Sequence, residues 1–136
     1  MLAKWEERFS IKNKTIDEHH KKLFSLLNSI HDALMNNKSK TIIEPILKEL
    51  KEYTIYHFKT EEDWMIQSSY PKYQEHKAAH LYFIEKIAEF ENQFQQKVEL
   101  SSIPIEIWIF LKDWLVEHIL KMDGQLGPYL SEHGIS

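Results

Sequence analysis

The sequence predicts an all-α protein: an up-down-up-down antiparallel four-helix bundle with an N-terminal arm and a short C-terminal tail. Apolar residues recur at steps of three and four in four stretches of the 136-residue chain, which is the period of a helix with one buried face. Only three glycines and four prolines interrupt the chain, so helix breakers are few. Connections of about four to eight residues favour antiparallel neighbours.

The first two predicted helices cover residues 16–35 and 41–67. Thr15 and Glu18 form a capping-box pattern at the start of the first helix, and apolar residues follow at helical spacing. A polar break at residues 36–39 separates the two helices, and the same capping pattern recurs where the second begins.

The third and fourth predicted helices cover residues 73–96 and about 104–123. Two serines and a proline supply start signals for the fourth helix, which is followed by a glycine. Gly127 and Pro128 are expected to prevent any further helix. The fourth helix is therefore predicted to end near residue 123 and to be followed by a short C-terminal tail.

Residues 1–136 are expected to form a single domain, with Trp5 and Phe9 packing an N-terminal arm across the bundle. The formal net charge of −4 argues against nucleic acid or an anionic membrane as the main partner. The absence of cysteine excludes disulfides, Cys-ligated zinc and thiol catalysis. No secretory signal or membrane span is visible, so we expect a cytoplasmic protein.

Polar side chains interrupt the apolar faces of all four predicted helices. They are His20, His57, Glu61, His76, His80 and His118. In an antiparallel bundle these positions share one end, within about one to two helical turns. Burying an unpaired polar group costs roughly 2–7 kcal/mol, so the cluster needs a strong partner. A metal centre would satisfy all these groups together; a hydrogen-bonded polar network or a water-filled pocket is the alternative explanation.

The number of donors favours two metal ions. Five inward imidazoles exceed what a protein normally supplies to one ion, and two ions that share a carboxylate fit better. Asp123 is the best candidate for a second bridging carboxylate. It lies five residues after His118, which is about 140° around an ideal helix, so spacing alone does not establish this role. The spacing of His76 and His80 also occurs in the His-Glu-x-x-His motif of zinc proteases. Lys77 stands where that motif has its glutamate base, so a zinc protease is excluded.

These motifs resemble those of the hemerythrin family, specifically the single-domain bacteriohemerythrins. The matching motifs span nearly the whole chain; they are Ile16-Asp17-Glu18-His19-His20, His57-Phe58-x-x-Glu61-Glu62, His76-x-x-x-His80 and Trp114-Leu115-x-x-His118-Ile119 with Asp123. Two positions depart from the family pattern. His19 stands where glutamine is common and is expected to be a non-ligand, and Leu126 stands where many members have a tyrosine.

The resemblance implies a di-iron centre with an oxo or hydroxo bridge, in which the irons change between Fe²⁺ and Fe³⁺. It places His76, His80 and His118 on one iron. It places His20 and His57 on the other iron, which would keep one position open for dioxygen. Glu61 and Asp123 would bridge the two irons. An apolar pocket around the open position is implied for Phe58, Trp114, Leu115 and Ile119.

The implied function is reversible dioxygen binding, for oxygen storage, delivery or sensing, and not catalysis. An unidentified oxygen-accepting or signalling protein is an expected partner. A di-iron redox enzyme, acting as an oxidase or in peroxide or nitric oxide detoxification, is the alternative. Ferritin-like oxidases use paired Glu-x-x-His motifs, and this sequence has none, which disfavours that alternative.

Overall fold

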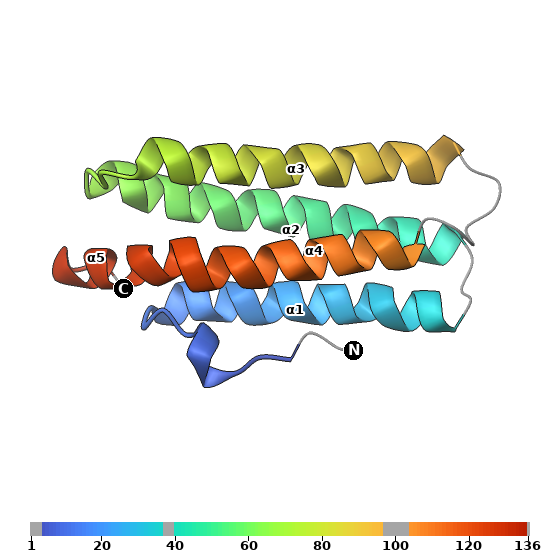
Figure 1. The fold of residues 1–136 in the computed structure, drawn as a ribbon, viewed down its shortest axis with the longest axis horizontal. Coiled ribbons are helices and arrows are strands. Elements are labelled where there is room, and N and C mark those ends of the chain that lie inside the picture. The colour runs from blue at the N-terminus through green and yellow to red at the C-terminus, as the bar shows by residue number, and fades with distance from the viewer. Residues whose placement is uncertain (1–3, 37–39, 97–103, 136) are drawn as a thin grey trace.

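The computed structural model describes residues 4–36, 40–96 and 104–135, and long helices run in alternating directions through it (Figure 1). The elements are η1 (Glu7–Phe9), α1 (Lys14–Met35), α2 (Lys40–Gln67), α3 (Tyr73–Gln96), α4 (Pro104–His118), the π-helical turn η2 (Ile119–Asp123) and α5 (Gly124–Glu132). The predicted all-α antiparallel bundle is confirmed. Within the described ranges, no helix is both long enough and apolar enough to cross a membrane.

The start of α1 differs from the prediction. Asn13 caps the helix, because its side-chain oxygen accepts a hydrogen bond from the backbone N–H of Ile16 at 3.0 Å. Thr15 was predicted to be the cap and instead lies inside the first turn. Thr41 is the second residue of α2, and its side chain lies outside the described residues. The predicted connection at residues 37–39 and the start signals at residues 101 and 102 also lie outside them.

The prediction that Gly127 and Pro128 prevent further helix is wrong, because the chain continues as α5 through both residues. Gly127 is needed for a close approach: a Cβ atom there would lie 2.2 Å from the carbonyl oxygen of Ile11. Pro128 lacks the N–H that would bond the Gly124 carbonyl, at the junction where the π-helical turn becomes α-helix. One backbone hydrogen bond is therefore lost without ending the helix.

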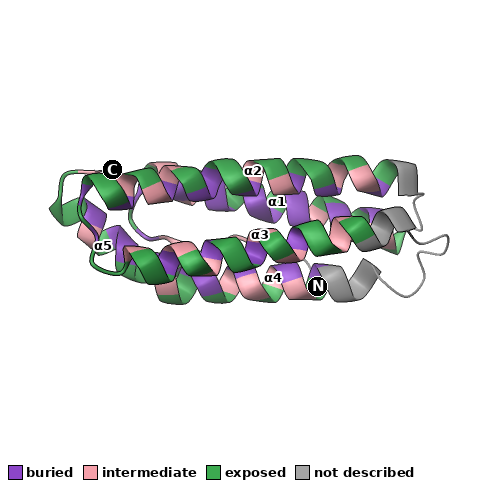
Figure 2. Cartoon of the chain, turned by 90° about the horizontal axis from the view of Figure 1, so that it is seen from above, coloured by how far each residue is buried: buried purple, intermediate pink, exposed green. Residues whose placement is uncertain are grey.

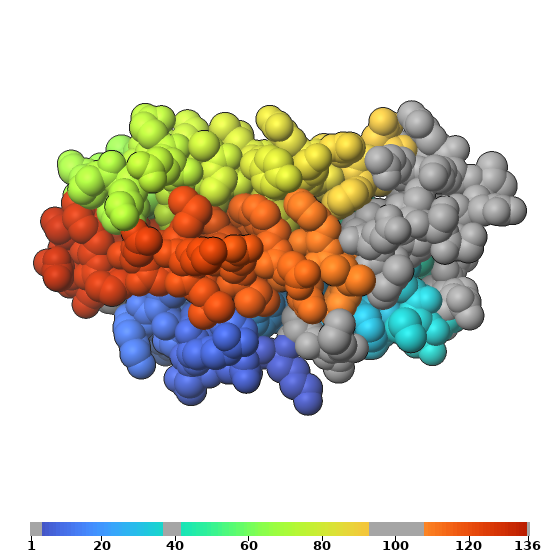
Figure 3. Space-filling model, viewed as in Figure 1, coloured from blue at the N-terminus to red at the C-terminus, as the bar shows by residue number. Residues whose placement is uncertain are grey.

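The buried faces of the helices meet along the bundle axis, while exposed residues cover the outside (Figure 2). Trp108 ties α4 to α1, because its indole N–H donates to the carbonyl of Leu27 at 2.7 Å. The N-terminal arm packs beside α4 (Figure 3), and Phe9 is 3% exposed with its ring centroid 5.4 Å from that of Phe24. The predicted packing of the arm is confirmed.

A second, smaller apolar cluster closes the end of the bundle where α5 lies. Leu126 and Leu130 of α5 pack there with Met65 and Tyr70. Leu126, at the position that departs from the family pattern, is fully buried in this cluster. The polar site described next therefore lies between two apolar regions.

Candidate metal centre

Seven buried side chains with metal-binding atoms gather near this end of the bundle. They are His20 from α1, His57 and Glu61 from α2, His76 and His80 from α3, His118 at the end of α4 and Asp123 at the end of η2. Each is at most 5% exposed. The structure thus brings together all seven predicted metal ligands.

Asp123 divides its two carboxylate oxygens between different histidines. Its Oδ1 atom lies 2.9 Å from Nε2 of His76 and 3.3 Å from Nε2 of His118. Its Oδ2 atom lies 3.0 Å from Nε2 of His20. One carboxylate therefore faces histidines from α3 and α4 on one side and from α1 on the other.

Glu61 divides its oxygens in the same way. Its Oε1 atom lies 3.2 Å from Nε2 of His80 and 3.7 Å from Nε2 of His76. Its Oε2 atom lies 3.5 Å from Nε2 of His57 and 4.0 Å from Nε2 of His20. Both carboxylates therefore lie between the same two sets of histidines.

The donor atoms form two overlapping groups, within each of which they lie no more than 4.8 Å apart. The three-histidine group contains His76, His80, His118, Glu61 and Asp123. The two-histidine group contains His20, His57, Glu61 and Asp123. Because the two groups share both carboxylates, the arrangement suits a pair of neighbouring cations.

The hydrogen bonding of these atoms is incomplete without a cation. Within the described part of the chain, both oxygens of Glu61 and Asp123, both ring nitrogens of His20 and Nε2 of His57 are buried and have no hydrogen-bond partner. Nε2 of His20 lies 3.0 Å from Oδ2 of Asp123, and Nε2 of His57 lies 3.5 Å from Oε2 of Glu61, yet neither contact is a hydrogen bond. Such a set of unpaired polar atoms would be costly in a polar network, and bound metal would satisfy it.

Burial shifts the pKa values of several donors. Burial is the main reason why the pKa of His57 lies well below its usual value, and it likewise lowers the pKa of His118. Neutral imidazole is the form that binds metal. Burial, followed by the charge of Asp123, raises the pKa of Glu61 well above normal. A cation beside Glu61 would counteract that penalty on its charged form.

The π-helical turn η2 explains how Asp123 reaches the site from five residues beyond His118. The N–H of Gly124 bonds to the carbonyl of Ile119, which is the i to i+5 pattern of a π-helix. This wider turn brings Asp123 close to the helix face of His118, whereas an ideal α-helix would carry it about 140° away. Spacing rules for a regular helix could not establish this contact.

Three neighbours of the donors were not predicted from the sequence as parts of the site. Glu62 lies with Oε2 2.8 Å from Nδ1 of His80. The Nδ1 atoms of His19 and His57 are 2.9 Å apart. Tyr70 packs edge-on against His76, with ring centroids 6.4 Å apart. These contacts depend on side-chain conformations, for which the sequence carries no periodic signal.

Aromatic rings cover the three-histidine group. Phe58 stacks on His80 with a centroid distance of 3.7 Å, and Trp114 stacks on His118 at 4.5 Å. Phe58 also lies 5.7 Å from the ring of His57. Leu115 and Ile119, the other two predicted pocket residues, are 2% and 1% exposed. The donors thus have apolar neighbours, and both stacked rings lie on histidines of the three-histidine group, whereas the prediction placed these residues around the open position of the other iron.

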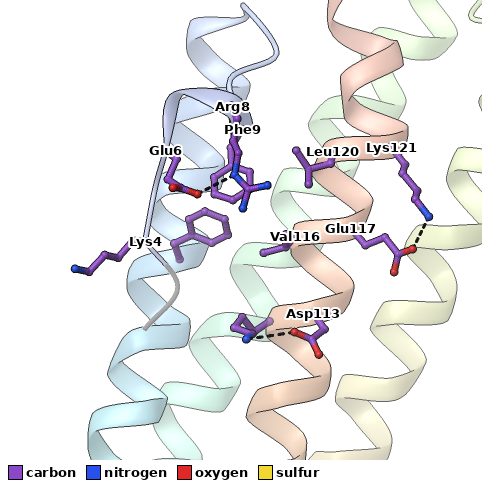
Figure 4. A pocket seen from close by; sticks show the side chains of 11 residues that line it. Lys4, Glu6, Arg8, Phe9, Asp113, Val116, Glu117, Leu120 and Lys121 are labelled. Carbon is purple, nitrogen blue, oxygen red and sulfur yellow. Dashed lines mark hydrogen bonds and ion pairs between the residues drawn. The ribbon is translucent and has the colours of Figure 1, made fainter. Parts of the chain in front are cut away.

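Two surface pockets lie along α4. A pocket of about 210 Å³ between α3 and α4 is bordered by Ala79, Trp114 and Met122 and reaches His118. A larger pocket of about 650 Å³ lies between the N-terminal arm and α4 (Figure 4). None of the seven donors lines the larger pocket, and the carboxylates around it pair with its own basic residues, as in the 2.6 Å contact of Lys121 with Glu117.

Comparison with known proteins agrees with this geometry. Residues 12–130 match the family model described as the hemerythrin HHE cation binding domain. A bacteriohemerythrin of Clostridium acetobutylicum is 34% identical over 125 residues, covering 89% of this chain and 95% of that protein. One from Methylococcus capsulatus is 35% identical over 117 residues, covering 85% and 86%. A wild-type hemerythrin crystal structure superposes with a TM-score of 0.87 at 30% identity, covering 94% of this chain and 97% of that chain.

Proposed function

Because the chain belongs to the hemerythrin family, we propose that it binds dioxygen reversibly at a non-haem di-iron centre, for oxygen storage, delivery or sensing. The observation that carries this proposal is the pair of donor groups that share Glu61 and Asp123. A single structural ion would not need a second group of donor atoms. It would also not need two carboxylates whose oxygens face different sets of histidines.

The two irons would have different numbers of protein ligands. His76, His80 and His118 would hold one iron, and His20 and His57 would hold the other. Glu61 and Asp123 would contribute one oxygen to each iron, as their divided contacts suggest. The iron with two histidines therefore has one protein ligand fewer, which supports an open position there for dioxygen. An oxo or hydroxo bridge would complete the centre.

The chain's own residues would control access to the irons. When bound, the two irons supply the electrons for dioxygen binding by changing between Fe²⁺ and Fe³⁺. Phe58 and Trp114 hold histidine rings by stacking, and Leu115 and Ile119 exclude water. Limiting water access protects the reduced centre from side reactions.

The composition of the site favours a carrier over a di-iron redox enzyme. Five histidines and two carboxylates surround the proposed centre. Ferritin-like oxidases use a carboxylate-rich set with paired Glu-x-x-His motifs. The relatives reported above bear the name bacteriohemerythrin, which is not an enzyme name. We therefore assign oxygen binding without turnover.

We further propose that the protein is cytoplasmic. A chain without cysteine has no need of an oxidising compartment, which is consistent with a cytoplasmic location. Dioxygen carried there would pass to an oxygen-accepting or signalling protein. Cell fractionation with an antibody against the chain tests the location, and recovery in the membrane or periplasmic fraction would contradict it.

Spectroscopy of the iron-loaded protein tests the central proposal. The protein is loaded with Fe²⁺ anaerobically, freed of reductant, exposed to air and then degassed. We expect two irons per chain and a visible absorption band that appears with dioxygen and disappears under vacuum over repeated cycles. Continuous oxygen consumption with a released product would instead indicate the oxidase. His57→Ala should lose the band, whereas His133→Ala, at an exposed position in the C-terminal segment, should retain it.

A further inference from the structure

His19 is a buried histidine that belongs to neither donor group. It precedes His20 on α1, is 8% exposed and packs against tyrosines of α2. Its ring is nearly perpendicular to that of His57, with an interplanar angle of 81° and a centroid distance of 5.1 Å. The Nδ1 atoms of these two rings are 2.9 Å apart, so the rings contact each other through nitrogen.

The contact fixes which nitrogen of each ring carries the proton. Nε2 of His57 points into the two-histidine group, 3.5 Å from Oε2 of Glu61, and must be free of hydrogen to bind metal. The proton of a neutral His57 therefore lies on Nδ1, which donates a hydrogen bond. Nδ1 of His19 must accept it, so the proton of His19 lies on its own Nε2.

We propose that His19 is a positioning residue that orients His57 and holds it in the tautomer that can bind the iron of the two-histidine group. This inference rests on the proposed function, because it assumes that His57 is an iron ligand. Metal-binding histidines commonly donate their second N–H to a fixed acceptor, and loss of that acceptor typically lowers metal affinity by about 10–100-fold.

The three-histidine group is anchored differently. Nδ1 of His80 lies 2.8 Å from Oε2 of Glu62, so the acceptor there is a carboxylate. A carboxylate makes the imidazole a stronger donor to metal, whereas the neutral ring of His19 supports orientation with less added charge. The two irons would therefore differ in the outer contacts of their ligands as well as in their number of ligands. Removing His19 should affect only the iron beside His57.

Anaerobic Fe²⁺ titration against a competing chelator tests this inference with two variants. His19→Phe keeps an aromatic ring against Tyr53 and Tyr56 but removes the acceptor. We expect one iron to bind as in the wild type and the other to bind about 10–100-fold more weakly. His19→Gln supplies an amide oxygen as acceptor and should restore the affinity to within about threefold of the wild type.

A double variant identifies the iron concerned. In a His57→Ala background, His19→Phe should cause no further loss of iron affinity, because His19 acts through His57. A further loss there, or wild-type affinity in His19→Phe itself, would overturn the inference. Equal loss in the Phe and Gln variants would also overturn it, by showing that the acceptor is irrelevant.

Controls distinguish a loss of folding, or a failure of the proposed di-iron function, from a loss of the positioning role of His19. Thermal melting followed by circular dichroism is compared for all chains, and His19→Leu replaces the Phe variant if the larger ring prevents folding. A wild-type chain that does not bind two irons would contradict the proposed di-iron function. A wild-type chain that binds two irons, with no change in His19→Phe, would contradict the role of His19 alone.

Discussion

The carboxylates of Glu61 and Asp123 show how single residues determine the stoichiometry of the candidate centre. Each places one oxygen near the three-histidine group and the other near the two-histidine group. Both are fully buried, and their oxygens lack hydrogen-bond partners among the described residues. A cation beside such a carboxylate would stabilise its charged form, and because each carboxylate belongs to both donor groups, we expect its loss to weaken both iron sites.

Replacing Glu61 tests the role of this shared carboxylate. Glu61→Gln keeps the shape of the side chain but removes the charge and one strong donor oxygen. We expect iron content to fall from two per chain to one or fewer, as measured by a colorimetric iron assay after gel filtration. Glu117→Gln, at a carboxylate that is 64% exposed, is the matched control and should keep both irons. Two tightly bound irons in Glu61→Gln would contradict the bridging role.

Predictability at the residue scale depended on helix periodicity. Six of the seven donors fall on apolar helix faces at helical spacing, so the sequence alone could predict that they meet. They are His20, His57, Glu61, His76, His80 and His118. The contacts of Glu62 and His19 were not predictable, because each depends on a side-chain conformation and on the position of a neighbouring helix. The structure brings the donors together, while their roles as iron ligands stay predictions until iron is measured.

At the scale of elements, the C-terminal end shows that glycine and proline alone do not predict where a helix ends. Gly127 and Pro128 were expected to stop the helix, yet both lie within α5. Gly127 allows α5 to approach the backbone of Ile11, so its effect is on packing between segments and not on helix termination. The π-helical turn before α5 could not be predicted from the sequence either, because the five residues that form it have no distinctive composition.

Two alanine substitutions separate the packing role of glycine from helix propensity. In Gly127→Ala the new Cβ atom would lie 2.2 Å from the oxygen of Ile11, so we expect a loss of about 1–3 kcal/mol in the free energy of unfolding. In Gly124→Ala the nearest atom is 3.6 Å away, so stability should be unchanged or rise by up to about 1 kcal/mol. Urea denaturation measures both, and equal effects would contradict the close approach.

The start of α1 gives a second prediction at this scale. Asn13→Ala removes the acceptor for the N–H of Ile16 and should lower the free energy of unfolding by about 0.5–2 kcal/mol. Asn13→Asp keeps an acceptor and should retain most of the stability. Thr15→Ala, at the position first predicted to be the cap, should have the smaller effect in the same urea experiment. A larger loss of stability from Thr15→Ala than from Asn13→Ala would indicate that Thr15 is the N-cap, as the sequence predicted.

At the scale of the whole molecule, the antiparallel order of the helices places the site. His20 lies near the start of α1 and His76 near the start of α3, while Glu61 and His118 lie near the ends of α2 and α4. Alternating directions bring these four positions to the same end of the bundle (Figure 1). The sequence could predict this because connection lengths and helix periods are local properties that together favour one topology.

The same placement couples folding of the bundle to iron. The site joins all four long helices near one end, and its unpaired buried atoms disfavour the metal-free folded state. With iron at about 100 times the dissociation constant, each site should add about 2.7 kcal/mol, so removing iron should lower the melting temperature by roughly 10 °C or more.

Calorimetry of the full chain with and without iron measures this difference. In His57→Ala the melting temperature should depend less on iron, because one of the two sites is impaired, whereas His133→Ala should behave as the wild type does. Equal melting temperatures for the iron-loaded and metal-free wild-type chains would mean that the bundle can accommodate its buried donors without a cation. The buried polar network would then be the better explanation, and the case for a di-iron centre would fail at its physical premise.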